Sequence, residues 1–521
     1  MKLSSIAMLL VLVSTLLFSI PFATSDLATD AFVQCLKKQV GKSIKPISEA
    51  IYIPENSKFS NIFYAYFRNK RLNTTKAQYP VAIVAAIHES HVQAAVICTK
   101  NHNYHLRIRS GGHDYEGLSY VSNEPFVLLD MSDFRSINID VATETAWVQS
   151  GASLGELYLN ISQKSKTHAF PGGVCPSVGV GGHFIGAGYG NLMRKYGLSV
   201  DNIIDAQLVD VNGKILNRKS MGEDHFWAIR GGGASFGVIL SWKIKLVSVP
   251  EIVTFFLVKK LIKQGATRSI TDLVYRWQQV ADTLPEDIFI RLEMSVEKNE
   301  SIQFQFFGQY LGQSHTLLSI MNQQFPELGL QQKDCIKSSW IETTLYWDNK
   351  PKGISLDSLL YRMLNESFPF KVKSDYVITP IPKAVLEELW KKMIKMGMGM
   401  IMQWNPYGGR MNQISESETP FPHRSGYKFL IQYWYYTQDD SKVESLRKLY
   451  DFLAPHVSQS PREAFLNYRD LDIGTNQNGA NSSIFGAKYF KGNFERLVRV
   501  KTKVDPDNFF RNEQSIPPLP K

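Results

Sequence analysis

Apolar and polar residues alternate along several short segments in the first half of the chain. In GVILSWKIKLV, residues 237–247, five apolar residues fall on alternate positions, from Val238 to Leu246. A period of two predicts a half-buried strand with these side chains on one face. Further strand-like runs are separated by turn signals, and the last contains an Asn212-Gly213 hairpin turn. These runs are residues 80–87, 105–110, 126–131, 145–152 and 206–216.

The pattern changes between about residues 251 and 460, where helical periods join the strand-like runs. In PKAVLEELWKKMIKM, Val385, Leu386, Leu389, Trp390 and Met393 form one apolar stripe, as expected for a helix packed on a core. Residues 500–520 are polar and proline-rich, and we expect them to lie over a finished domain.

The N-terminus predicts secretion. Lys2 precedes an apolar run over residues 6–22 that ends in small residues, which is the layout of a signal peptide over residues 1–25. A membrane anchor is the alternative, but the run is short for a span and no comparable run follows. The extracellular space or cell wall is therefore the expected location, with the vacuole as the alternative. Glycosylation acceptor sites fit this route; they are Asn73, Asn160, Asn299, Asn365 and Asn481.

Composition narrows the function classes. A chain of 521 residues with 44% hydrophobic residues can bury a large core and form two or more domains. The net charge of +10 favours acidic surroundings, such as an anionic polysaccharide or an acidic cofactor. Nucleic acid is not expected as a partner, because the basic residues are dispersed. Zinc-type clusters and the two common nucleotide-binding glycine motifs are absent from the sequence, so we expect no metal.

Four cysteines in an oxidising compartment allow one or two disulfides. Cys35 and Cys98 stand in helix-like contexts and could pair. Cys175 stands between glycines and a proline, and Cys335 is interpreted as a buried thiol.

Glycine is concentrated in four segments of the strand-rich half, at residues 110–113, 171–173, 179–190 and 229–237. Glycine allows the backbone to approach a flat ligand closely, and its N–H groups can bind anions. These segments therefore indicate a large, flat ligand packed against the backbone.

Several of these segments carry a family resemblance. RSGGHDYEG, FPGGVCPSVGVGGHFIGAGYG, DHFWAIRGGGASFG and NYRDLDIG resemble the plant berberine bridge enzyme-like proteins, flavoproteins of the vanillyl-alcohol oxidase superfamily. The resemblance covers the whole mature chain and implies an α+β fold. It places a PCMH-type FAD-binding domain at 26–250 and an α/β substrate domain, with an antiparallel sheet flanked by helices, at 251–460. Residues 461–521 are then expected to return to the FAD domain, and we expect a monomer.

The resemblance implies FAD held by two covalent bonds, from His113 and from Cys175. Imidazole nitrogen and thiolate are nucleophiles, and the oxidised flavin ring is an electrophile. Further cofactor-binding residues are expected in the same motifs. They are Arg109, Ser110, Gly111, Gly112, Gly181, Gly182, His183 and Gly188.

Four residues match the family's substrate site: Tyr115, Tyr189, Gln432 and Tyr468. The implied reaction is hydride transfer from a substrate C–H to the flavin, with a protein base removing a proton. Relatives carry a lysine or a glutamate two positions before the glutamine, where this chain has Leu430.

The missing charge at Leu430 leaves open how a tyrosine becomes a base. Arg291 and Glu293, two apart in a strand-like run, should face the same way and could supply the charge, although a surface ion pair is an equal alternative. Tyr189 is the expected base, while Tyr115 and Gln432 orient the substrate.

Oxygen use is predicted from Val178, three residues after Cys175. In the family a valine at this position leaves an oxygen pocket, so the chain is expected to be an oxidase that releases hydrogen peroxide. The substrate is expected to be a small alcohol, a phenolic compound or an oligosaccharide. Oxidative cyclisation or a flavin-supported cycloaddition is the alternative that Leu430 favours, and a non-catalytic binding protein is the third hypothesis.

Overall fold

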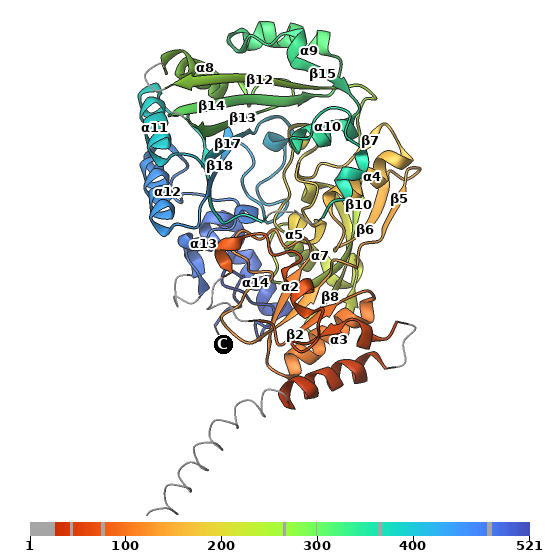
Figure 1. Ribbon diagram of the computed structural model, residues 1–521. Helices are drawn as coiled ribbons and strands as arrows, with labels where there is room; N and C mark the ends of the chain where they lie inside the picture. Colours follow the sequence, from red (N-terminus) through yellow and green to blue (C-terminus); the bar gives the residue numbers. More distant parts are fainter. Residues whose placement is uncertain are drawn as a thin grey trace, which may run out of the picture.

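The computed structural model describes residues 27–41, 45–73, 79–263, 267–298, 300–362, 367–476 and 482–520. Two regions share the molecule: a large antiparallel sheet at one end and a group of smaller sheets at the other (Figure 1). The predicted signal peptide and the acceptor residues Asn299, Asn365 and Asn481 lie outside the described residues. Asn73 is exposed, and the half-buried Asn160 donates a hydrogen bond to the Glu156 carbonyl.

The strand-rich half contains the predicted strands, in separate sheets. A four-stranded sheet has the order β1-β2-β4-β3, and a five-stranded antiparallel sheet has the order β5-β6-β10-β8-β9. Their strands are β1 (Ile51–Tyr52), β2 (Ala82–Ala85), β3 (His105–Arg109), β4 (Phe126–Asp130), β5 (Ile137–Asp140), β6 (Thr145–Gln149), β8 (Ile203–Val209), β9 (Ile215–Leu216) and β10 (Val238–Lys245). A two-stranded sheet joins β7 (His168–Ala169) and β11 (Val247–Ser248).

Helices pack around these sheets. They are α2 (Phe59–Tyr64), α3 (Glu89–Asn101), α4 (Leu154–Lys164), α5 (Val180–Ile185), α6 (Met193–Tyr196) and α7 (Arg218–Ile229). The Ser153 side chain begins α4 by accepting from the Glu156 N–H, while the Glu156 carboxylate accepts from the Ser153 N–H. This reciprocal capping satisfies two N–H groups that the first turn leaves free.

Strand β10 differs from the prediction of one buried face. Val238 and Leu240 pack in a cluster with α3, whereas Trp242 and Ile244 pack in the larger core of the molecule. The pairing of β10 with β8 shifts register between Ile239 and Ser241. A bulge of this kind interrupts the alternation of side chains, so one strand supplies two cores.

The second half is built on a seven-stranded antiparallel sheet with the order β15-β12-β14-β13-β17-β18-β16. Its strands are β12 (Val253–Lys263), β13 (Ile288–Glu297), β14 (Ser301–Tyr310), β15 (Cys335–Ser338), β16 (Phe370–Val377), β17 (Met400–Pro406) and β18 (Phe429–Tyr436). The helices of this half are α8 (Arg268–Val280), α9 (Ser314–Gln324), α10 (Trp340–Trp347), α11 (Lys383–Met396) and α12 (Asp440–Phe452).

One face of this sheet is covered by helices. The predicted stripe of α11 is confirmed, since Leu386, Leu389, Trp390 and Met393 are fully buried against the sheet together with residues of α8 and α12. Burying each such side chain contributes about 1.5–3 kcal/mol. The opposite face of the sheet is directed toward the strand-rich half (Figure 1).

The C-terminal segment packs on the strand-rich half rather than only lying over it. It forms α13 (Ser482–Phe490) and α14 (Phe494–Val504). Beyond α14, Phe509 and Phe510 are buried in the same cluster as α3. Arg107 of β3 pairs with Glu513 at 2.8 Å.

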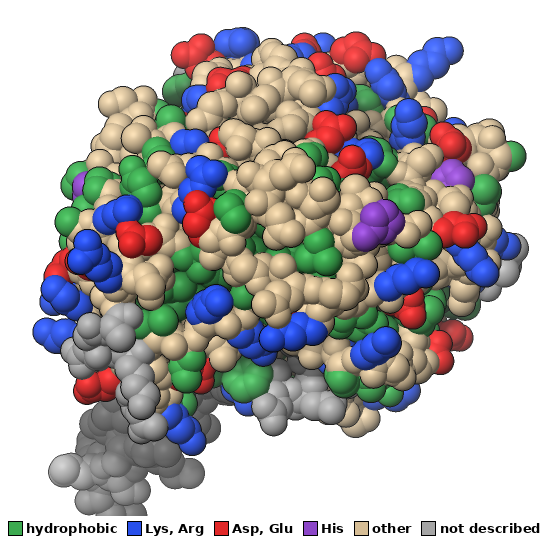
Figure 2. All heavy atoms as spheres, turned by 90° about the horizontal axis from the view of Figure 1, so that it is seen from above, with side chains coloured by type: hydrophobic (Ala, Val, Ile, Leu, Met, Phe, Trp, Pro, Cys, Tyr) green, Lys and Arg blue, Asp and Glu red, His purple; other side chains and the backbone are tan. Residues whose placement is uncertain are grey.

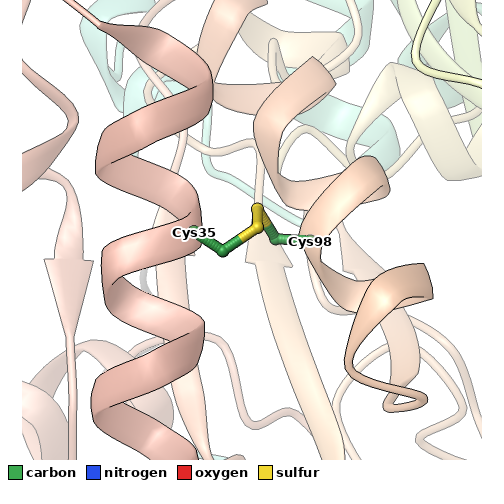
Figure 3. Close-up of a disulfide and its surroundings, with 2 residues drawn as sticks. All are labelled: Cys35 and Cys98. Atoms are coloured by element: carbon green, nitrogen blue, oxygen red, sulfur yellow. A yellow bond between two sulfur atoms is a disulfide. The ribbon is translucent and has the colours of Figure 1, made fainter.

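A disulfide joins Cys35 to Cys98, confirming the pairing that the sequence left open (Figure 3). Cys35 lies in the helix over residues 27–40 and Cys98 in α3. Cys335 is a half-buried free thiol whose Sγ lies 3.6 Å from the Gln331 carbonyl.

Charged residues of both signs are interspersed on the face seen in Figure 2. None of the described helices is long and apolar enough to cross a membrane. Within the described ranges, no group of three or more His, Cys, Asp and Glu side chains could hold a metal ion.

Candidate active site

A cavity of about 600 Å³ lies between the glycine-rich loops and the uncovered face of the seven-stranded sheet. It brings together most of the residues predicted from the sequence, although they come from distant parts of the chain. Those that line it are Ser110, Gly111, Gly112, His113, Tyr115, Cys175, Val178, Gly181, Gly182, His183, Tyr189, Gln432 and Tyr468.

His113 and Cys175 meet at Ser177. The Ser177 hydroxyl lies 3.1 Å from His113 Nε2 and 3.6 Å from Cys175 Sγ. Burial, with a smaller contribution from the Arg68 guanidinium, lowers the pKa of His113 to about 3, so its imidazole is neutral near pH 7. Burial raises the pKa of the Cys175 thiol, while Ser177 and Arg68 act in the opposite direction.

The glycines of the cavity wall serve two purposes. A Cβ at Gly111 would collide with the backbone of Gly179, so this position is needed for two loops to approach. A Cβ at Gly182 would meet no protein atom within 4 Å and would instead occupy the cavity. The Ser150 hydroxyl is buried there without a partner among the described residues. Open space and a free polar group fit a bound cofactor.

Two predicted cofactor residues are corrected by the structure. The Arg109 side chain is fully buried away from the cavity, where it pairs with Asp130 and donates to the carbonyl of Phe63 at 2.6 Å. The Asp130 carboxylate compensates this buried charge, and it lies on the neighbouring strand. Gly188 does not line the cavity either; its φ of +71° serves the turn before Tyr189.

Three tyrosines form the wall nearest the sheet. The hydroxyl groups of Tyr189 and Tyr468 share a hydrogen bond. The Tyr115 ring stacks on the Tyr468 ring, with centroids 5.7 Å apart and an interplanar angle of 15°. Gln432 Nε2 donates to the Tyr115 hydroxyl at 2.9 Å. The structure therefore unites the four residues predicted for the substrate site.

Arg291 supplies a positive charge near the position of Leu430. Leu430 of β18 pairs with Asn405 of β17, and the Asn405 side chain accepts from Arg291 Nε at 2.6 Å. Arg291 lines the cavity and is 4% exposed. Arg291 lies on β13, two strands from Leu430 of β18 in the sheet, and neighbouring strands are about 4.8 Å apart. The Arg291 charge therefore reaches the cavity wall near the position of Leu430. No carboxylate of a described residue forms an ion pair with it.

Glu293 does not pair with Arg291. Its carboxylate accepts from Gln403 Nε2 at 2.6 Å and from Gln305 Nε2 at 3.3 Å. Burial raises the pKa of Glu293, and Arg291 partly offsets this effect. The surface ion pair considered from the sequence is therefore wrong, because Arg291 is buried.

The three phenols differ in acidity. Burial raises the pKa of Tyr115 and of Tyr468 well above the ordinary value for tyrosine. Burial also raises the pKa of Tyr189, but the Arg291 charge and the hydrogen bonds from Tyr468 and Arg291 lower it. Tyr189 is thus the phenol in this wall at which Arg291 opposes the effect of burial both by its charge and by a hydrogen bond.

The sequence reasoning missed the aromatic side of the cavity. Trp434 packs on Phe370 with ring centroids 4.6 Å apart, and Trp347 also lines the cavity. The indole N–H groups of Trp347 and Trp434 are buried with no acceptor among the described residues. A signal for Trp434 was available, because it lies two residues after Gln432 and must share its face of the strand.

Comparison with known proteins identifies the chain's relatives. Residues 80–218 match the family described as FAD binding domain, and residues 464–517 match that described as Berberine and berberine like. Berberine bridge enzyme-like 4 of Arabidopsis thaliana is 51% identical over 504 residues, which cover 94% of each chain.

Solved structures agree. Berberine bridge enzyme from Eschscholzia californica is similar with a TM-score of 0.88 and 35% identity, covering 94% of this chain and 99% of that one. Phl p 4, a grass pollen allergen with glucose dehydrogenase activity, is similar with a TM-score of 0.88 and 41% identity, covering 94% and 100%. The fold, the cavity and these relatives together show that the chain belongs to the berberine bridge enzyme-like family of FAD-binding oxidoreductases.

Proposed function

We propose that this protein is a secreted oxidase that converts an alcohol to a carbonyl compound, with Tyr189 as the base. The observation that carries this proposal is the position of Tyr189 between the Tyr468 hydroxyl and the Arg291 charge. Bound FAD would supply the hydride acceptor for the substrate carbon, and O2 would take up the two electrons together with the transferred hydrogen and the proton of the substrate hydroxyl to give hydrogen peroxide.

Proton removal falls to the phenolate of Tyr189. The anion accepts the hydroxyl proton of the substrate, and the nearby guanidinium stabilises the phenolate before the reaction. Tyr115 and Gln432, which are hydrogen-bonded to each other, orient the substrate hydroxyl. Relatives carry a charged residue at the position of Leu430. In this chain Arg291 supplies the positive charge instead, from another strand.

Two covalent bonds to FAD, from His113 and Cys175, belong to this proposal. Support comes from their common place in the cavity and their shared neighbour Ser177. A neutral imidazole has a free lone pair at neutral pH. Burial raises the pKa of Cys175, and Ser177 and the Arg68 guanidinium partly offset this in favour of the thiolate, which is the nucleophilic form.

Oxygen as the electron acceptor is supported by Val178. This residue lines the cavity close to Cys175 along the chain. A relative gives independent support: a variant of Phl p 4 with a single isoleucine-to-valine replacement is a glucose oxidase. A small β-branched side chain near the cofactor is consistent with access for O2.

The substrate is proposed to present a flat, partly apolar face. Tyr436 and Phe368, which are 40% and 47% exposed, stand at the outer end of the cavity wall with ring centroids 5.8 Å apart. Trp434 connects Tyr436 to Tyr115 through ring contacts. Such a row can bind a phenolic ring or the C–H face of a sugar, so phenolic alcohols and oligosaccharide ends are the two candidate classes.

Ring closure or cycloaddition is the second candidate function. It is favoured by the neutral Leu430 at a position where relatives use a charged residue, since a reaction without net oxidation needs no strong base. Release of a product with the mass of its substrate, without oxygen uptake, would identify the cycloaddition, whereas oxidative ring closure would give a product two hydrogens lighter and consume O2.

An oxygen electrode with a peroxide assay tests the proposed function. The panel contains oligosaccharides, monolignols and prenylated phenolics. Oxygen uptake with equal hydrogen peroxide release supports the oxidase. Anaerobic turnover of a panel member without peroxide contradicts it and supports the second candidate.

A further inference from the structure

The loop that carries Tyr115 and the segment that carries Tyr468 are joined by charges on both sides of the stacked rings. Asp114 and Glu116 flank Tyr115 in the chain. Arg469 and Asp470 follow Tyr468 directly. Although the two tyrosines are 353 positions apart in the sequence, the neighbours of one bind the neighbours of the other.

Asp114 forms the first connection. Its Oδ2 accepts from Arg469 Nε at 2.9 Å, and both side chains are largely buried. Its Oδ1 accepts from the N–H groups of Glu116 and Leu118, at 3.0 and 3.1 Å. One carboxylate therefore fixes the turn around Tyr115 and holds the residue next to Tyr468.

Glu116 forms the second connection through Lys371 of β16. The Glu116 carboxylate pairs with Lys371 Nζ and accepts from the Leu471 N–H at 3.3 Å. Lys371 Nζ lies 2.8 Å from Asp470 Oδ1, and Lys373 Nζ lies 2.6 Å from Asp470 Oδ2. Lys371 and Lys373 are 7% and 2% exposed, so water screens these charges little.

Ion pairs on the surface contribute little to the stability of a protein. This cluster, however, is buried and bridges three parts of the chain. Breaking the Asp114–Arg469 pair leaves the Arg469 charge without its carboxylate, and loss of the Glu116 charge leaves Lys371 held only by Asp470 and Asp472, on the Tyr468 side. Relief of such a charge requires movement of the Tyr115 loop or of the segment 469–472. Either movement separates the Tyr115 ring from the Tyr468 ring.

We infer that Asp114 and Glu116 are positioning residues, which form an ionic clamp with Arg469, Lys371 and Asp470 that keeps Tyr115 stacked on Tyr468. The catalytic consequence rests on the proposed role of Tyr115. The clamp itself sets only where the two phenols lie. Asp114 lines the cavity, but its two carboxylate oxygens are occupied by Arg469 and by the N–H groups of Glu116 and Leu118.

Hydrogen exchange on the holoenzyme tests the clamp without using activity. Asp114→Asn keeps an oxygen for the Glu116 and Leu118 N–H groups but removes the charge that faces Arg469. Glu116→Gln removes the second connection. Asp287→Asn is the matched control, because the pair of Asp287 with Lys195 also joins the two halves of the molecule but lies away from the cavity.

Both clamp variants are expected to speed amide exchange in peptides covering residues 113–118 and 466–473, by roughly tenfold or more, while the control leaves these peptides unchanged. Unchanged exchange in both segments, or the same change in Asp287→Asn, overturns the clamp. This arm is independent of the proposed function.

Anaerobic flavin reduction tests the catalytic consequence. Asp114→Asn is expected to lower the reduction rate at saturating substrate by roughly tenfold, the scale of a small misplacement, with flavin content unchanged. In a Tyr115→Phe background, Asp114→Asn should cost less than twofold, because it acts through the Tyr115 phenol. An equal loss in both backgrounds overturns the positioning role. A wild-type rate for Tyr115→Phe alone refutes the proposed role of Tyr115, and hydrogen exchange then decides the clamp.

Discussion

Tyr189 and Tyr468 share a hydrogen bond between their hydroxyl groups inside a buried cavity. Two phenols in an apolar wall would normally both stay protonated, because burial disfavours the anion. Arg291 partly offsets this effect at both phenols, and either hydroxyl can donate in the shared hydrogen bond. On the proposed mechanism the pair holds one negative charge during catalysis, and Tyr189 carries it.

Removing the Arg291 charge should move the pH dependence of catalysis. The base is active as the phenolate, which forms above its pKa, and Arg291 lowers the pKa of Tyr189. Arg291→Met should therefore shift the rising limb of the reduction rate to higher pH and lower the rate at pH 7 by at least tenfold. Stopped-flow reduction across a pH series measures this shift. Arg291→Lys keeps the charge and is the control; a shift as large as that of the methionine variant would contradict an electrostatic role.

The covalent bonds to FAD can be tested in unfolded protein. The wild type should stay yellow and fluorescent on a denaturing gel, because the proposed bonds from His113 and Cys175 would each hold the cofactor. His113→Ala or Cys175→Ala alone should leave one bond, and only the double variant should release FAD. Free flavin in the filtrate of unfolded wild-type protein refutes the double linkage, whereas Cys335→Ala should change nothing.

Val178→Leu should slow the reaction of the reduced enzyme with O2. The larger side chain fills cavity space close to Cys175, while the substrate wall around Gln432 is untouched. We expect reoxidation to fall by roughly a hundredfold and anaerobic reduction by substrate to change less than twofold, both followed by stopped-flow absorbance. Equal reoxidation rates for the wild type and Val178→Leu would show that Val178 does not control the access of O2.

Loss of the disulfide should destabilise the N-terminal region. Cys35 and Cys98 are 63 residues apart in sequence. Closing a loop of this length lowers the entropy of the unfolded chain, which stabilises the folded protein by about 4 kcal/mol. The double variant Cys35→Ser and Cys98→Ser should therefore show a lower melting temperature by calorimetry. Cys335→Ser, which removes a half-buried free thiol, is the control and should melt within a degree or two of the wild type.

The sequence predicted those helices and turns that are determined by the residues within the element itself. The stripe of α11 is buried as expected, and the Asn212-Gly213 turn connects β8 to β9. The alternation in β10 failed at Leu240, because a bulge depends on the neighbouring strand β8 and not on β10 alone.

The residues of the site were predicted from sequence motifs. Contacts between residues that are far apart in the sequence could not be predicted in this way. Arg291 reaches Asn405 across 114 positions, and its burial decides whether it acts in the cavity or on the surface. Arg109 stands inside a cofactor motif, yet its side chain is taken by Asp130 on the next strand. Lys371 and Lys373 stand in none of the motifs, and the carboxylates that pair with them come from residues 116, 470 and 472.

The identity of the base is the central claim, and anaerobic flavin reduction in Tyr189→Phe tests it most directly. Tyr468→Phe is the matched variant, because it removes the other hydroxyl of the same hydrogen bond. Tyr189→Phe should lower the reduction rate by roughly a hundredfold or more, the usual scale for a general base, and Tyr468→Phe should lower it less. A wild-type rate in Tyr189→Phe together with a large loss in Tyr468→Phe would contradict the account and assign the base to Tyr468.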